Sequence, residues 1–545
     1  MTDREEMSDV RAEMVPDQAV QRDHALGRST ATIAGLTLVS RVSGFARIVV
    51  VTAVLGTTAL GDVYETANLV PNILFELFAA GSVQAVMVPA LVAADERDGS
   101  GNRLANAVLG WLLATLGVLM VFALLVAPLA MRVLTAAEPD AALRADKREL
   151  GTRFLAIFLV QLLFYAAGLV ATALLQARRR FAAPAVAPLV NNVVVITAYL
   201  LFDRLRDGQP PSLSLSGGEL AVLAGGTTLG VVAFTAVPVL AAMRHGVRWR
   251  PRLARDPEIA RLARQGAWAG AYLGLTQLLT LGVLIIGNGA SGTVARFTFA
   301  LAFFQLPYAL IAVPVATARF PAMASAVLAR ASDRLARLVG DGVVTTVAGC
   351  ALASAALLAL AWPLVRLTAY GHVAGGAIAP LAHAVAAFAP GLVGYGLFFL
   401  LTRVRYAQGD VRSPTLANGL VALAGLLAMV VGSMLTADSE RAAALAAAYG
   451  GAHLVGTIVL AVITERSLPE LRGTGVARGI VAGLAIATVA GGAMIAVTRV
   501  LGGTGRAGAL VALVLGGLAG AVVFALALPP ASGRSWRTLV GARSA

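Results

Sequence analysis

Long apolar runs separated by short polar segments fill nearly the whole chain. A membrane-spanning helix needs about 20 mostly apolar residues to cross a hydrocarbon layer of roughly 30 Å. Fourteen segments meet this requirement, at residues 29–56, 63–93, 104–131, 153–177, 182–202, 218–243, 265–288, 293–328, 338–365, 376–401, 413–436, 442–464, 476–498 and 507–529. The eighth contains three prolines, at which it could split into two helices. We therefore predict an all-α polytopic membrane protein with about fourteen transmembrane helices.

Composition supports this fold class and narrows the chemistry. Of the 545 residues, 58% are apolar and 13% charged, and the mean hydropathy is +0.81, far outside the range of soluble domains. The single cysteine, Cys350, lies in the ninth span and excludes an intramolecular disulfide. The five histidines, at positions 24, 245, 372, 383 and 453, lack metal-ligand spacing. The sequence also lacks a glycine-rich phosphate loop and a nucleophile elbow. We therefore expect a transporter rather than an enzyme, with no metal, cofactor or ATP site.

The distribution of charge predicts the orientation in the membrane. The formal net charge is +14, and most Lys and Arg residues lie in the tails and in the loops that follow even-numbered spans. The positive-inside rule then places both termini in the cytoplasm. The densest basic segments are 178–180, 244–264 and 466–478. Because these segments flank membrane spans, we expect them to bind anionic membrane lipids and not nucleic acid.

Two junctions between spans suggest an internal repeat. They read ARRRFAAPAVAPLVNNV, between spans 4 and 5, and VRYAQGDVRSPTLANGLV, between spans 10 and 11. Each has Pro188 or Pro414 at the helix entry and Asn192 or Asn418 four residues later. Arginine followed by proline is also common at unrelated helix entries, so that alternative stays open.

Because six helices separate the two junctions, the repeat predicts two six-helix lobes followed by an extra pair of helices. The predicted divisions are a disordered cytosolic tail (1–28), an N-lobe (29–243), a basic cytosolic linker (244–264), a C-lobe (265–464), the last two helices (465–529) and a second cytosolic tail (530–545).

The first span, which contains the segment SRVSGFARIVV, has two arginines inside it. Arg41 would lie about 18 Å from the cytosolic end of this helix, and Arg47 about 9 Å further on and roughly 120° around it. An arginine at this depth costs several kcal/mol unless it faces a partner or a water-filled cavity. A guanidinium fork binds phosphate oxygens bidentately, so we expect the pair to bind a pyrophosphate or another anionic headgroup. The alternative is an ion pair with Asp62, Glu65 or Glu76.

The second and eighth spans combine prolines with polar side chains. In the second span, Pro71 and Pro89 interrupt the hydrogen bonding, and a polar stripe runs through Asn68, Asn72, Glu76 and Gln84. The eighth carries Pro307, Pro314 and Pro321, with Arg296 near its outer end and Gln305 deeper. Broken helices of this kind border cavities and allow alternating access. Kinked packing without a ligand is the other reading.

These segments resemble a known family. SRVSGFAR, then GTTALGDVY from Gly56, then LVPNILFELFAAGSVQAVMVPAL, resemble the first two helices of the MurJ/MviN lipid II flippases of the MOP transporter superfamily, and ASGTVARFTFALAFFQLPYALIAVPVA extends the match. The resemblance implies a V-shaped pair of six-helix lobes around a cationic cavity, with the last two helices forming a groove for a lipid tail. The implied substrate is lipid II, an undecaprenyl-pyrophosphate disaccharide-pentapeptide. Transport would be coupled to the membrane potential or an ion.

On this resemblance, Arg41 and Arg47 match the arginines that hold the pyrophosphate, and Asp62 matches the acid after the first span. The chain departs from the family pattern at Ile48, Phe75, Glu76 and Ala80. Ala302 and Gln305 stand where the family has an arginine and a nearby acid, and Arg296 is the candidate substitute.

The predicted binding residues are Arg41, Arg47, Asp62, Asn68, Asn72, Glu76, Arg296 and Gln305. The partners are lipid II or a related polyprenyl-pyrophosphate glycan lipid, membrane lipids and proteins of cell-wall synthesis. Two alternatives remain: a MOP-type transporter of another glycan lipid or a small cation, and a non-transporting scaffold for cell-wall synthesis.

Overall fold

The computed structural model describes residues 35–36, 39–77, 81–253, 257–373, 376–501, 503 and 505–532, and all regular elements in these ranges are helices. After a first helix over residues 39–55, the labelled helices are α2 (Ala59–Phe75), α3 (Gly81–Asp98), α4 (Gly101–Leu134), α5 (Ala141–Phe158), α6 (Gln161–Ala177), α7 (Ala182–Arg206), α8 (Gly217–Leu220), η2 (Ala221–Gly225), α9 (Gly226–Arg244), α10 (Pro257–Gly287), α11 (Thr293–Pro307), η3 (Tyr308–Ala312), α12 (Val313–Leu328), α13 (Ser332–Thr368), η4 (Gly371–Val373), α14 (Ile378–Phe388), α15 (Gly391–Ala407), α16 (Arg412–Leu435), η5 (Asp438–Glu440), α17 (Arg441–Ser467), η6 (Pro469–Thr474), α18 (Val476–Leu501) and α19 (Arg506–Ser532).

The helices confirm the predicted all-helical membrane fold. Among the described residues, eleven helices are long and apolar enough to cross a membrane, or twelve when α14 and α15, bent by 40°, form one span. These correspond to the predicted spans from the third to the fourteenth. The first predicted span begins outside the described residues, as do the predicted tail 1–28 and most of the tail 530–545. The count of fourteen therefore stays a prediction.

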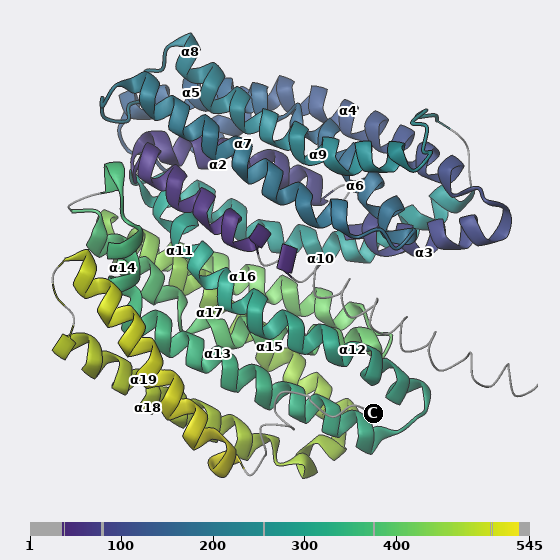
Figure 1. Cartoon of the computed structure of the whole chain (residues 1–545), viewed down its shortest axis with the longest axis vertical. Coiled ribbons are helices and arrows are strands. Elements are labelled where there is room, and N and C mark those ends of the chain that lie inside the picture. The colour runs from purple at the N-terminus through teal and green to yellow at the C-terminus, as the bar shows by residue number, and fades with distance from the viewer. Residues whose placement is uncertain are drawn as a thin grey trace, which may run out of the picture.

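The helices pack into two halves that lie one above the other in Figure 1. One apolar core runs from Val51 to Val247, and the buried residues Leu284 and Val294 of later helices join it. A second core joins buried residues between Leu279 and Leu460. The last two helices, α18 and α19, share a smaller core with α13 on the outside of the second half. The exact residue boundaries predicted for the lobes stay a prediction.

Matching hydrogen bonds connect the repeated asparagines to the helices that open each half. Asn192 on α7 donates from Nδ2 to Ser43 Oγ of the first helix at 2.9 Å. Asn418 on α16 donates to the Tyr272 carbonyl and to Thr276 Oγ1 of α10 at 2.7 and 2.9 Å. In both halves, the fifth membrane helix is thus tied to the first. The repeated asparagines therefore have equivalent structural positions.

Three of the predicted spans are divided between two helices: the second between α2 and α3, the fourth between α5 and α6, and the tenth between α14 and α15. Helix α10 is continuous but begins at Pro257, earlier than predicted. The eighth stays continuous as a span but contains the π-helical turn η3 directly after Pro307. Proline has no backbone N–H and clashes with the carbonyl four residues before it, and π-turns often re-aim side chains at functional sites.

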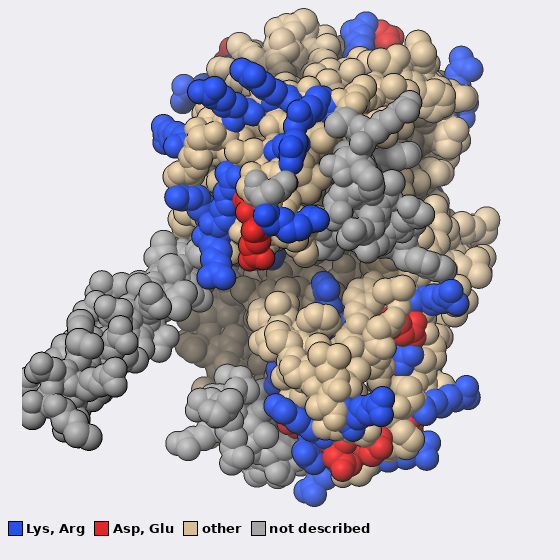
Figure 2. Space-filling model, turned by 90° about the vertical axis from the view of Figure 1, so that its right-hand side faces the viewer, with Lys and Arg blue, Asp and Glu red and all other residues tan. Residues whose placement is uncertain are grey.

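The ends of α6, α9 and α12 lie on one basic face. Exposed arginines here include Arg179, Arg180, Arg244 and Arg330, together with Arg248, Arg250 and Arg252 of the linker. Figure 2 views this face and shows blue side chains on both halves, with the surface hollowed between them. The linker backbone is held against α4, because Asn106 accepts from Arg250 N at 2.6 Å and donates to the Arg248 carbonyl at 3.1 Å.

Candidate functional site between the two halves

Arg47 points into the first half. Ser43, one turn earlier on the same side of the helix, is held by Asn192 of α7, and this contact fixes the orientation of the helix. The Arg47 guanidinium lies within electrostatic range of Glu65 on α2, Tyr165 on α6 and Tyr199 on α7. Among the described residues, no carboxylate forms an ion pair with it within 4 Å. A half-buried arginine in this position retains donors for an anionic ligand.

Arg41 lies on a different side of the same helix and is exposed. Four residues further on, Phe45 packs edge-to-face against Phe303 of α11, with ring centroids 4.9 Å apart. Ile48 and Val49 also pack against the core of the second half. The first helix therefore lies between the halves, with Arg47 facing the first half and Arg41 on the side nearer the second. This agrees with the predicted angular separation of the two arginines.

Asp62 joins the two halves at the end opposite the basic face. Its side chain is fully buried and accepts from the backbone N–H groups of Gly292 and Ala295 at 2.5 and 3.0 Å. Those N–H groups belong to the first turn of α11, where the helix dipole favours a negative charge. Gly292 has φ of 79°, and a Cβ there would lie 2.1 Å from the Thr57 carbonyl oxygen. Asp62 thus holds the outer ends of α2 and α11 together, and its carboxylate is already occupied.

Arg296 lies beside this contact rather than deeper in the span. It is 8% exposed and donates from Nη2 to the Ser291 carbonyl at 3.0 Å and to Thr293 Oγ1 at 3.4 Å. The guanidinium is within electrostatic range of Asp62, Glu440 and Asp438. Burial among these groups at the outer end of α11 gives Arg296 a structural environment far from the expected position of the missing arginine, Ala302.

A second buried contact at the outer end was not predicted. Lys147, the chain's single lysine, is fully buried on α5 and pairs with Glu138 at 2.7 Å. Its Nζ also donates to the Asn288 carbonyl at 3.0 Å, and Asn288 donates to Thr66 Oγ1 at 2.9 Å. This Lys147 network links α5 and α2 of the first half to the end of α10. In the sequence, the feature that could have indicated this contact was the position of the single lysine next to a membrane span.

Replacing Lys147 with methionine should destabilise the folded protein. Glu138 would keep a buried charge without its partner, and breaking one side of a buried ion pair costs about 3–5 kcal/mol. The double variant Lys147→Met with Glu138→Leu should recover most of the lost stability, because neither charge remains. Thermal unfolding of the purified variants measures both effects. A single variant as stable as the parent would contradict the role of the network.

The remaining predicted residues lie further towards the basic face. Gln277 of α10 donates a hydrogen bond to Glu76 and so bridges the two halves. Asn72 and Asn68 are half-buried, and Asn72 Nδ2 donates to the Asn68 carbonyl at 2.9 Å. Gln305 is exposed on α11. The structure therefore places one predicted subset at the outer contact (Asp62, Arg296) and leaves Arg41, Arg47 and the asparagines nearer the middle.

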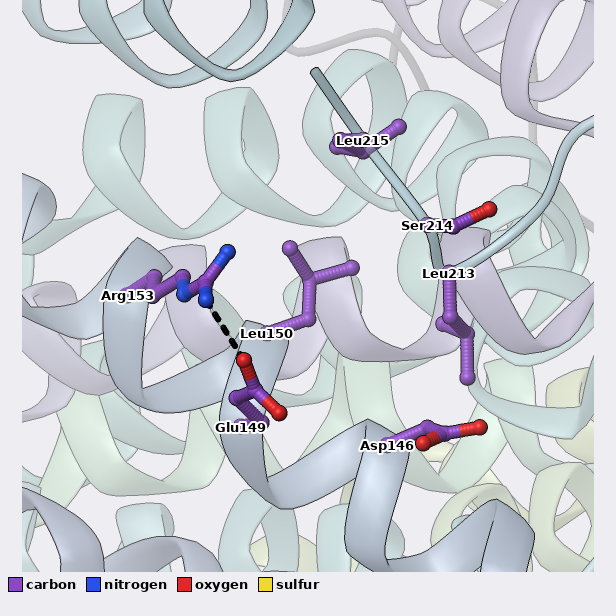
Figure 3. A pocket seen from close by; sticks show the side chains of 7 residues that line it. All are labelled: Asp146, Glu149, Leu150, Arg153, Leu213, Ser214 and Leu215. Atoms are coloured by element: carbon purple, nitrogen blue, oxygen red, sulfur yellow. Dashed lines mark hydrogen bonds and ion pairs between the residues drawn. The ribbon is translucent and has the colours of Figure 1, made fainter. Parts of the chain in front are cut away.

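A surface cavity of about 320 Å³ lies elsewhere, between α5 and the loop before α8. Figure 3 shows Leu150 and Leu213 on its sides, Asp146 at its edge, and Glu149 paired with Arg153. Two of its three charged side chains are acidic and the third is already paired. This cavity would repel a pyrophosphate, so we do not assign it to the site.

Comparison with known proteins assigns the family. The model of the family "Lipid II flippase MurJ" matches residues 51–516. A probable lipid II flippase MurJ of Rhizobium meliloti is 29% identical over 454 residues, covering 82% of this chain and 83% of that protein. The lipid II flippase MurJ of Burkholderia cenocepacia is 27% identical over 402 residues, covering 71% and 75%.

Solved structures show the same fold. A lipid II flippase MurJ in an inward closed conformation superposes with a TM-score of 0.73 at 16% identity, covering 91% of this chain and 98% of that one. An inward-facing MATE transporter of the MOP superfamily gives a TM-score of 0.57 at 14% identity, covering 81% and 96%. With the family model matching most of its length, this multi-pass membrane chain belongs to the lipid II flippase MurJ family.

Proposed function

We propose that this chain moves lipid II across the bacterial cytoplasmic membrane by alternating access. The match of the MurJ family model to residues 51–516 is the main evidence for this proposal. The two-half fold and the arginines of the first helix support it, because a lipid-linked pyrophosphate needs cationic donors inside the bilayer. The chain acts as a transporter rather than an enzyme, and its substrate is the undecaprenyl-pyrophosphate disaccharide-pentapeptide.

The proposed roles of the residues differ with their depth in the membrane. Arg41 and Arg47 bind the pyrophosphate between the halves, with Asn68 and Asn72 nearby for the polar headgroup. Asp62, Arg296 and the Lys147 network hold the outer ends together, while the surface between the halves is hollowed on the basic face (Figure 2). Opening to the other side then requires these contacts to separate. Energy comes from the membrane potential or a coupled ion, and both termini lie in the cytoplasm with the basic face.

Complementation tests the proposed function. The full chain should restore growth to a bacterium depleted of its own lipid II flippase, at a membrane level matched to that of the native protein. Failure of a well-inserted parent chain to restore growth would contradict lipid II transport and favour another glycan lipid or a scaffold role.

A further inference from the structure

The second half needs its own contact with the anionic headgroup, if the proposed function holds. A substrate bound between the halves can shift them from one conformation to the other only if its contacts differ between the two conformations. The first half already supplies Arg41 and Arg47 for such contacts. In the second half, Ala302 occupies the expected arginine position, and Arg296 is buried at the outer end of α11. The second half would therefore need another cation that faces the substrate.

Arg403 of α15 has the required surroundings. Its guanidinium carbon lies 4.9 Å from the centroid of the Phe399 ring and 6.0 Å from that of Tyr406. It is also within electrostatic range of Tyr272 on α10 and Tyr308 on η3. Arg403 is therefore close to η3 and α10 as well as to the rings of its own helix. Because α10 packs against α3 of the first half, Arg403 lies near the helix through which the second half contacts the first.

Arg403 differs from Arg405 on the same helix in having no anionic partner. Among the described residues, no carboxylate lies within 4 Å of its guanidinium. Arg405, two residues later, donates to Asp410 at 3.1 Å and to Ser467 at 2.8 Å. Arg319 donates to Thr345 at 3.4 Å. Cation–π contacts with the aromatic rings hold the Arg403 guanidinium group in place. These contacts leave its N–H groups available as hydrogen-bond donors.

We propose that Arg403, with the hydroxyls of Tyr272 and Tyr308, binds a phosphate of the substrate's pyrophosphate on the side of the second half. A guanidinium fork and phenol O–H groups are donors that suit phosphate oxygens. Arg403 lies about 6 Å from the end of α15 on the basic face, at 1.5 Å per residue. At this depth, Arg403 would contact the pyrophosphate as it enters from the basic face.

Binding measurements on the purified full chain test the role of Arg403. The probes are undecaprenyl pyrophosphate, the uncharged undecaprenol and phosphatidylglycerol, and the variants are Arg403→Gln and Arg403→Lys. Arg366→Gln is the matched control, because Arg366 is also half-buried and lies over an aromatic ring, that of Trp362, at 5.7 Å. Thermal unfolding confirms that each variant is folded.

Arg403→Gln should weaken binding of undecaprenyl pyrophosphate about tenfold or more, since it removes charge-assisted bonds. Binding of undecaprenol should not change, Arg403→Lys should recover part of the affinity, and Arg366→Gln should resemble the parent. Unchanged affinity for the pyrophosphate, an equal loss for undecaprenol, or a loss confined to phosphatidylglycerol would overturn the assignment. If the parent binds lipid II and restores growth while Arg403→Gln changes nothing, only the Arg403 inference fails.

Discussion

Arg47→Ala and Arg41→Ala should each abolish the ability of the chain to restore growth in flippase-depleted cells. Arg47 faces the first half within electrostatic range of Glu65, and Arg41 is exposed beside the second half. Each side chain supplies donors that an anionic headgroup needs inside the bilayer, where water does not replace them. Losing a charged contact of about 3 kcal/mol corresponds to roughly a hundredfold loss of affinity for the headgroup, and growth at matched membrane levels measures its consequence.

Arg132→Ala provides the control for these variants, because Arg132 is an exposed arginine in the last turn of α4. It should restore growth as well as the parent does. Arg47→Lys should restore growth only in part, since lysine keeps the charge but loses the planar fork. Full rescue by either alanine variant would show that the first-helix arginines do not bind the substrate.

Asp62→Ala should cause a large loss of stability, comparable to that of Lys147→Met at the same end. Two buried backbone N–H groups, of Gly292 and Ala295, would lose their acceptor, and Arg296 would lose a nearby countercharge. Breaking such a buried charged contact costs about 3 kcal/mol or more. Thermal unfolding of the purified protein measures the loss.

The accessibility of the outer end should also change in Asp62→Ala. A cysteine introduced at Thr57, beside Gly292, should react faster with a membrane-impermeant thiol reagent once the α2–α11 contact is lost. Asp62→Asn should be intermediate, because an amide oxygen can accept one of the two hydrogen bonds but carries no charge. Equal stability and equal labelling in Asp62→Ala and the parent would contradict the proposed closure at this end.

The apolar pattern predicted much of the fold because a membrane span is long and uniform. Spans such as 293–328 and 476–498 therefore agree with the observed helices α11–α12 and α18 within a few residues. The breaks were harder to predict. The division of the fourth span near Leu159 and the early start of α10 at Pro257 depend on packing between helices, which a single sequence does not reveal.

The positions of site residues could be predicted from the sequence only where they depend on spacing within a single helix. The spacing of Arg41 and Arg47 indicated that their side chains leave the first helix on different sides, and Arg47 indeed lies near Glu65 of the first half while Arg41 is exposed. The environment of Asp62 depends on Gly292, 230 positions further along. Nothing local to either residue indicates that contact. Arg403 was missed for the same reason, since its aromatic neighbours come from α10, η3 and α15.

Transport of lipid II by the reconstituted chain would test the central claim most directly. Fluorescent lipid II in proteoliposomes, with an imposed membrane potential, becomes accessible to a membrane-impermeant quencher when it crosses the bilayer. The account predicts rapid exchange with the parent chain and none above protein-free vesicles with the Arg41→Ala/Arg47→Ala double variant. No exchange with a folded parent chain, or equal exchange with the double variant, would contradict it.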